Sequence, residues 1–198
     1  MAKKPFKQSE IPHALIHEIM DGKPLYYRGY RDVMNKTKQI EEIMGSSSLQ
    51  FRLVDYLLGI FYAKINRKKF IIATNEAGLH LNRRNNLSSD IAIFSKDVLT
   101  AEQTNNKYAQ VPPFLAIEID TQVEFEDMSS STYINKKTQK LLDFGVEKVV
   151  WFFTTSKKVL IARKNEDWIM HDWDKNVELM PGIEANVADF LREEGIQF

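Results

Sequence analysis

The sequence predicts an α/β domain in which helices flank a mixed sheet. Two stretches, 47–65 and 130–144, carry apolar residues at helical intervals. Between them, FLAIEID (114–120) is a nearly continuous apolar run, which is typical of a strand covered on both faces. The length of 198 residues suits one domain, 1–198, because a chain of this size buries roughly 70% of its extended surface.

The first third of the chain predicts a hairpin, a loop and a long helix. ALIHEIM and PLYYRG flank Asp21 and Gly22, a pair that favours tight hairpin turns. The polar stretch after them predicts a loop with one helical turn. Ser47 then precedes Gln50 by three residues, which is the spacing of a capping box, and begins the predicted helix 47–65.

The middle of the chain predicts several strands. FIIAT (70–74) and LHL (79–81) are expected to form two strands separated by a turn near Gly78. DIAIF (90–94) is expected to form a third. The polar stretch 95–113 then predicts a loop with at most one helical turn, before the strand FLAIEID.

The last third predicts a helix, a hairpin and a closing helix. The helix 130–144 is expected to end at Gly145, because glycine is favoured just past a helix terminus. KVVWFFT and KKVLIAR pair as a hairpin around Ser156, and WIMHDW adds a short strand. The final helix is expected over 184–194.

Composition excludes several classes of function. Lysine plus arginine and aspartate plus glutamate each number 27, so no global positive field attracts nucleic acid, and any such binding requires a local patch. The absence of cysteine excludes disulfides, thiolate metal sites and cysteine nucleophiles. The four histidines lack the spacing of a zinc site, and no glycine-rich phosphate loop occurs. Since no apolar run approaches the roughly 20 residues of a membrane span, we expect a soluble, cytoplasmic protein.

Glu118 is the anomaly of the apolar strand FLAIEID. Side chains alternate along a strand, so Glu118 and Asp120 are expected to share a face with Ala116. Two such carboxylates repel each other, and a divalent cation or a lysine removes that penalty. The alternative for Asp120 is that it merely ends the strand at the surface.

Lys137 lies on the apolar stripe of its predicted helix. Ile134, Lys137, Leu141 and Phe144 recur at steps of three and four, which places the lysine on the side that faces the sheet. An isolated lysine in this position can extend its ammonium group past the edge of the core. Here the carboxylates offer it a partner instead.

Asp90 begins the strand DIAIF after two serines, where a cap or turn role is the ordinary interpretation. Its combination with Glu118 and Lys137 favours a different role. Hard oxygen ligands from two acids suit Mg²⁺ or Mn²⁺, and an adjacent lysine can orient or deprotonate the attacking water. This set of groups performs phosphodiester hydrolysis.

The ordered set SSDIAIF, PPFLAIEID, and Lys137 followed by LLDFGVEKVVWFF resembles the Uma-two family of restriction-endonuclease-like proteins, within the PD-(D/E)XK nuclease superfamily. The resemblance covers most of the chain. It implies a restriction-endonuclease-like fold, metal binding by Asp90 and Glu118, and Lys137 as the catalytic lysine on the helix. Gln50 falls where relatives often place a histidine, so it is a possible further site residue.

Two positions depart from the family pattern. Ser89 replaces the usual proline before the aspartate, and Asp120 stands where the superfamily commonly has its lysine. The second departure makes activity depend on Lys137. The resemblance implies a Mg²⁺-dependent or Mn²⁺-dependent endonuclease that acts on DNA, and nucleases that cut both strands are commonly homodimers.

Two alternatives remain open. The chain could keep the nuclease scaffold without its chemistry, as a binding or regulatory module for a protein or a DNA end. The trio of Asp90, Glu118 and Lys137 could also be an ordinary buried ion network, in which case apolar replacements of like size would leave stability near neutral.

Overall fold

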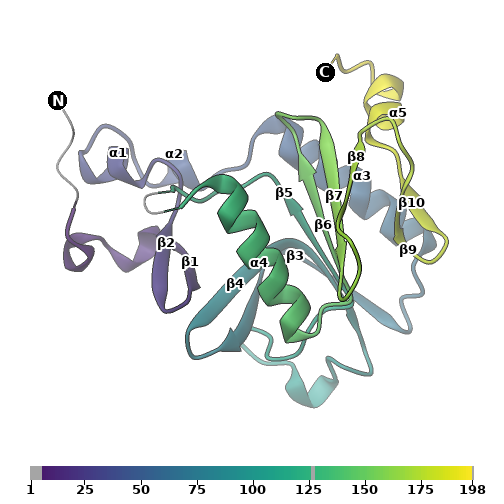
Figure 1. The fold of residues 1–198 in the computed structure, drawn as a ribbon, viewed down its shortest axis with the longest axis horizontal. Coiled ribbons are helices and arrows are strands. Elements are labelled where there is room, and N and C mark those ends of the chain that lie inside the picture. The colour runs from purple at the N-terminus through teal and green to yellow at the C-terminus, as the bar shows by residue number, and fades with distance from the viewer. Residues whose placement is uncertain (1–5, 126–127, 198) are drawn as a thin grey trace.

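The computed structural model describes residues 6–125 and 128–197. Its centre is an eight-stranded sheet in the order β2-β1-β4-β5-β6-β7-β8, with β3 paired to β4 (Figure 1). β5 and β6 run parallel, and the other described neighbours pair antiparallel. The strands are β1 (Ile16–Met20), β2 (Lys23–Tyr26), β3 (Phe70–Asn82), β4 (Asn85–Ser95), β5 (Leu115–Ile119), β6 (Lys148–Phe153), β7 (Lys158–Arg163) and β8 (Ile169–Asp172). The predicted mixed sheet is confirmed.

Helices lie on both faces of this sheet. Figure 1 shows α4 on the near side and α3 behind it. The α-helices are α1 (Tyr30–Met34), α2 (Glu41–Met44), α3 (Ser48–Lys64), α4 (Ser130–Phe144) and α5 (Val187–Glu193), and the 3-10 turns are η1 (Gln8–Glu10), η2 (His13–Leu15) and η3 (Ala101–Gln103). Every described helix is too short or too polar to cross a bilayer.

The central strands separate two hydrophobic cores. Ile91, Ile117 and Val150 point toward α3 and pack in one cluster with its buried face. Ala92 and Ala116, which alternate with them, point toward α4 and pack in the other. A polar residue two positions from Ala92 or Ala116 on the same strand therefore also points toward α4.

Local sequence signals fix the ends of the two main helices. The Ser47 side chain accepts a hydrogen bond from the Gln50 backbone N–H, which confirms the predicted capping box of α3. Ser129 caps α4 in the same way through Thr132. α4 ends at Gly145, whose φ of 115° is left-handed, as predicted for this glycine.

Several expectations for the N-terminal half need correction. The strand expected to begin at Asp90 begins at Asn85, so Asp90 lies inside β4 and not at its first position. The segment 70–82 is one continuous strand, β3, rather than two strands with a turn near Gly78. Its pairing with β4 shifts between Thr74 and Ala77, and both Asn75 and Glu76 have positive φ angles, of 63° and 55°. A bulge therefore replaces the predicted turn. The polar loop after β2 also holds two short helices, α1 and α2, rather than one turn.

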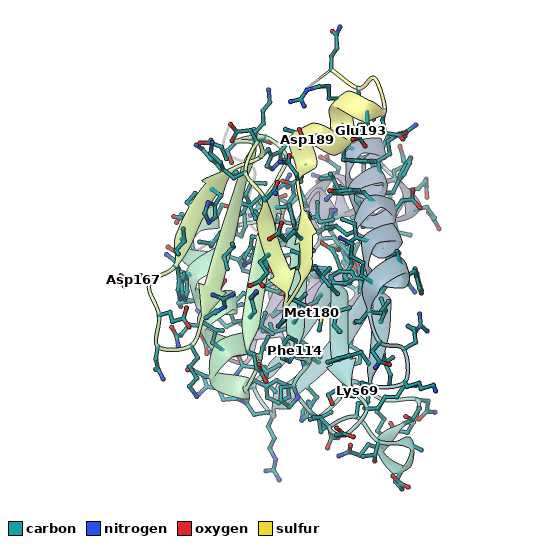
Figure 2. All side chains as sticks on the ribbon, turned by 90° about the vertical axis from the view of Figure 1, so that its right-hand side faces the viewer. Lys69, Phe114, Asp167, Met180, Asp189 and Glu193 are labelled. Carbon is teal, nitrogen blue, oxygen red and sulfur yellow. The ribbon has the colours of Figure 1, made fainter. Side chains whose placement is uncertain are left out.

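The C-terminal region also differs from expectation. The stretch predicted as a helix over 184–194 begins instead with a strand, β10 (Ile183–Ala185), which pairs with β9 (Val177–Met180). The helix α5 starts only at Val187, after the cap Asn186. Figure 2 shows this small hairpin, with Met180 at one end, between the main sheet and α3. Its buried residues extend the α3-side core.

Candidate active site

Asp90 and Glu118 come from adjacent strands and face the same side of the sheet. β4 and β5 pair Ile91 with Ile117, so the same register one residue further sets Asp90 opposite Glu118. Residues directly opposite each other have Cβ atoms about 5 Å apart. The Asp90 Oδ2 atom also accepts a hydrogen bond of 2.7 Å from the Ile119 backbone N–H. The structure therefore brings the two predicted acids together.

Lys137 joins them from α4. Its side chain is buried, and its Nζ lies 2.8 Å from Glu18 Oε1 and 3.0 Å from Glu118 Oε2. The ammonium group also lies over the rings of Tyr133 and Trp151, 5.7 and 5.5 Å from their centroids. The lysine therefore points at the sheet, as its helical stripe predicted, and does not extend to solvent.

The charge of Lys137 is fixed by this environment. Burial lowers the pKa of its amine, but the charges of Glu118 and Glu18 outweigh burial and raise that pKa well above its ordinary value. The amine consequently stays protonated across the physiological range. Lys137 is a stationary cation in this site.

Glu18 was not among the predicted site residues. Its carboxylate is buried and accepts hydrogen bonds from the Ser88 backbone N–H (2.9 Å) and the Tyr133 hydroxyl (2.7 Å), beside its ion pair with Lys137. Burial raises the pKa of this carboxyl, but Lys137, His17 and the Ser88 hydrogen bond together outweigh burial, so the pKa lies below the ordinary value. A signal existed in the sequence, because Glu18 lies two positions before Met20 and therefore shares its core-facing side of the strand.

Glu118 keeps one carboxylate oxygen without a partner. Lys137 binds Oε2, whereas the buried Oε1 has no hydrogen-bond partner among the described residues. Burial raises the pKa of this carboxyl to about 8, against the opposing effect of Lys137, and the charges of Asp90 and Glu18 add to the rise. A buried acceptor of this kind costs free energy unless a proton, a donor or a cation satisfies it.

Asp120 does not act as the neighbour of Glu118 that strand alternation predicted. β5 ends at Ile119, and Asp120 adopts a left-handed φ of 58°. Its carboxylate accepts hydrogen bonds from the backbone N–H and the hydroxyl of Thr154, at 2.8 and 2.5 Å. The carboxylate thus ties the end of β5 to the end of β6.

Asp120→Asn is therefore expected to reduce stability and not metal binding. Asparagine tolerates the positive φ, but it loses charge-assisted hydrogen bonds to Thr154, so we expect the free energy of unfolding to fall by about 1.5 kcal/mol. Urea denaturation measures this change. A variant that keeps its stability yet fails to bind Mn²⁺ would show that Asp120 is a ligand after all.

A small inner cavity lies among these groups. Its volume is about 10 Å³, close to what a single water molecule needs, and its lining includes His17, Glu76, Asp90, Glu118 and Lys137. Burial lowers the pKa of His17, and its Nδ1 is buried with no hydrogen-bond partner among the described residues, 3.9 Å from Glu76 Oε1. The fold thus places His17, one of the four histidines without zinc-site spacing, at the cavity wall.

A larger outer hollow of about 470 Å³ adjoins the inner cavity and shares Glu76, Asp90, Ile119 and Gln122 with it. Gln50, the possible site residue on the first long helix, lines this hollow and donates a 3.0 Å hydrogen bond to the Ile119 carbonyl. Gln50 thus reaches the end of β5. At the rim, the large apolar side chains of Met44 and Phe51 are about half exposed, at 47% and 54%.

The charges around the inner cavity do not cancel. Glu76, Asp90, Glu118 and Asp120 line it, and Glu18 lies behind Lys137, which is the cation in its lining. Burial raises the pKa of Asp90, as expected for a carboxyl that lacks a direct cationic partner. When Asp90 and Glu118 are ionised, an approaching phosphate meets a surplus of negative charge.

Asp90 and Glu118 suit a divalent cation that takes only one or two of its ligands from the protein. Within residues 6–125 and 128–197, no three His, Asp or Glu side chains are grouped to hold a metal ion. Mg²⁺ commonly binds through one or two carboxylates and takes its remaining ligands from water and substrate phosphates. Glu118 Oε1, which has no hydrogen-bond partner among the described residues, lies beside Asp90 and matches that pattern, with hard oxygen donors at the wall of the inner cavity.

Comparisons with known proteins support the fold. The chain matches no family model and no curated protein. It does resemble the crystal structure of a putative nuclease belonging to DUF820 from Anabaena variabilis, with a TM-score of 0.61 and 14% sequence identity. The match covers 88% of this chain and 89% of that one. DUF820 corresponds to the Uma-two group, so the restriction-endonuclease-like fold predicted from the sequence is confirmed.

Proposed function

We propose that this chain, which shares its fold with a DUF820 structure, is a divalent-metal-dependent nuclease that hydrolyses phosphodiester bonds in DNA. The observation that carries the proposal is the partnerless Oε1 atom of Glu118. It is buried at a cavity that it shares with Asp90 and Lys137. An apolar strand that holds such an acid, with a cation on one oxygen and no partner among the described residues on the other, is suited to a second cation.

Asp90 and Glu118 would hold Mg²⁺ or Mn²⁺ in this arrangement. A bound divalent cation supplies neutralisation of phosphate charge and Lewis-acid activation of water, which is the chemistry of metal-dependent phosphodiester hydrolysis. The Ile119 backbone N–H fixes the Asp90 carboxylate through Oδ2 at 2.7 Å. The two acids are thus held on rigid strands, which favours a defined ligand geometry.

Lys137 would act in this mechanism as a fixed positive charge. Its amine stays protonated, because the adjacent carboxylates raise its pKa. A protonated amine cannot accept a proton from water, so the base role considered from the sequence is disfavoured. The remaining role is to orient the attacking water or to stabilise charge that develops on the phosphate.

The outer hollow offers a path for the substrate. Its volume of about 470 Å³ can accommodate part of a nucleotide, and its lining includes Asp90 together with the half-exposed Met44 and Phe51. Cutting of both DNA strands would be served by a homodimer, which presents two such sites related by symmetry.

A direct test is cleavage of supercoiled plasmid by the purified protein. We expect nicked and linear products with Mg²⁺ or Mn²⁺, and none when EDTA removes the metal. A control variant, Glu184→Gln in the exposed part of β10, should cleave as the wild type does. Absence of cleavage with either metal, on double-stranded and single-stranded DNA alike, would contradict nuclease activity.

Metal binding is expected to depend on pH. The cation binds the deprotonated carboxylate, and burial raises the pKa of Glu118 to about 8, so binding below that pH must release a proton. The Mn²⁺ affinity should therefore rise by up to about tenfold per pH unit between about pH 6 and pH 8, and level off above. Calorimetry in buffers of different ionisation enthalpy measures both affinity and released protons. A flat affinity profile would contradict this assignment.

One observation favours the second candidate function, a module that binds a partner without catalysis. Lys137 already pairs with Glu118 at 3.0 Å and could serve as a permanent replacement for the metal. Calorimetry with Mn²⁺ separates the candidates. Saturable uptake that disappears in Glu118→Gln supports the nuclease, whereas no uptake by the wild type supports the module.

A further inference from the structure

We propose that Glu18 is a positioning residue that holds Lys137 in place and so leaves Glu118 available to a divalent cation. This inference rests on the metal site proposed above. Glu18 contacts neither the predicted metal position nor the outer hollow, since it is absent from the lining of both. Its influence would pass through the lysine alone.

The contacts of Glu18 are those of an anchored anion. Oε1 lies 2.8 Å from Lys137 Nζ and also accepts from the Ser88 backbone N–H at 2.9 Å and the Ser88 hydroxyl at 3.3 Å. Oε2 accepts from the Tyr133 hydroxyl at 2.7 Å. Donors from β4 and α4 therefore fix both oxygens, and the residue is 2% exposed. An anion that has so many partners is not free to turn away from the lysine.

Glu18 and Glu118 both pair with the ammonium group of Lys137. Lys137 is buried, so it requires a counter-charge in direct contact. If Glu118 were the sole counter-charge, a cation that bound Glu118 would repel the lysine and compete with it for the same carboxylate. With Glu18 present, Lys137 keeps an ion pair of 2.8 Å when Glu118 turns its charge toward the metal. Glu18 thereby lowers the cost of metal binding.

Mn²⁺ titration calorimetry on four proteins tests the inference: the wild type, Glu18→Gln, Lys137→Met and the double variant. We expect Glu18→Gln to weaken Mn²⁺ binding at least about tenfold, as loss of supporting partners of metal ligands commonly does. In the Lys137→Met background the same substitution should have no effect, because the residue through which it acts is gone. Glu184→Gln serves as the surface control.

The Mn²⁺ affinities of the four proteins distinguish a failure of this inference from a failure of the metal site. Equal affinities of the wild type and Glu18→Gln would overturn the role of Glu18 while leaving the metal site standing. An additive loss in the double variant would show a general structural role and overturn it as well. No Mn²⁺ uptake by the wild type would overturn the metal site itself, and with it this inference. If Glu18→Gln does not fold, Glu18→Asp keeps the charge but shortens its reach, and an unchanged affinity there would also refute the inference.

Discussion

Glu118→Gln is expected to reduce the rate of DNA cleavage by about a thousandfold, and Asp90→Asn by a similar factor, because loss of one group that stabilises the transition-state charge costs about 10² to 10³ in rate. Glutamine has nearly the shape of glutamate but cannot supply an anionic oxygen at the position of Oε1, which has no hydrogen-bond partner among the described residues. Single-turnover cleavage of a labelled oligonucleotide in Mg²⁺ measures the effect.

The neighbouring lysines of α4 supply the matched comparison. Lys137→Met should lower the cleavage rate by about a hundredfold or more, since it removes the fixed cation of the site. Lys136→Met should cleave normally, because the exposed Lys136 lies 3.9 Å from Asp21 and away from the centre. Equal rates in the wild type and in all three site variants would remove this site from the chemistry.

Lys137→Met is also expected to cause the largest loss of stability. It leaves Glu18 and Glu118 buried beside each other without the cation that both contact. Breaking a buried ion pair by removal of one partner costs about 3 to 5 kcal/mol. Urea denaturation at about pH 8 measures the loss, and the variant's slope against urea checks that unfolding remains two-state.

Neutralising the two acids should restore most of this loss. In the variant that combines Lys137→Met with Glu18→Gln and Glu118→Gln, both acids that contacted the lysine are neutral, so we expect stability within about 1 to 2 kcal/mol of the wild type. This recovery is compatible with an active metal site and with the simple ion network alike; DNA cleavage and Mn²⁺ uptake separate the two. Wild-type stability in Lys137→Met alone would contradict the observed pairing.

Periodic patterns made much of the fold predictable. The apolar spacing and caps of α3 and α4 gave helices within a residue of those observed, and Asp21 with Gly22 marked the first turn. The same spacing placed Lys137 on the sheet side of its helix. Such signals are local, and each depends on the chemistry of a few neighbouring residues.

Other features depend on distant parts of the chain. Lys137 lies more than a hundred positions after Glu18, so the residues near Glu18 indicate that it is buried but not which cation pairs with it. β3 continues through a bulge because β4 supplies its hydrogen bonds on both sides of Asn75 and Glu76. Asp120 does not continue the alternation of side chains along β5, because its carboxylate accepts a hydrogen bond from the Thr154 backbone N–H. In each case tertiary pairing overrides the local pattern.

The order in which the centre is synthesised follows from the chain positions of its members. Glu18, Asp90 and Glu118 emerge from the ribosome before Lys137, so a nascent chain that ends before α4 carries the acids without their neutralising amine. Repulsion among these acids would oppose close pairing of β1, β4 and β5 until α4 docks. Docking of α4 removes the repulsion and also covers one hydrophobic face. Completion of this hydrophobic core and pairing of Lys137 with Glu18 and Glu118 are thereby a single event.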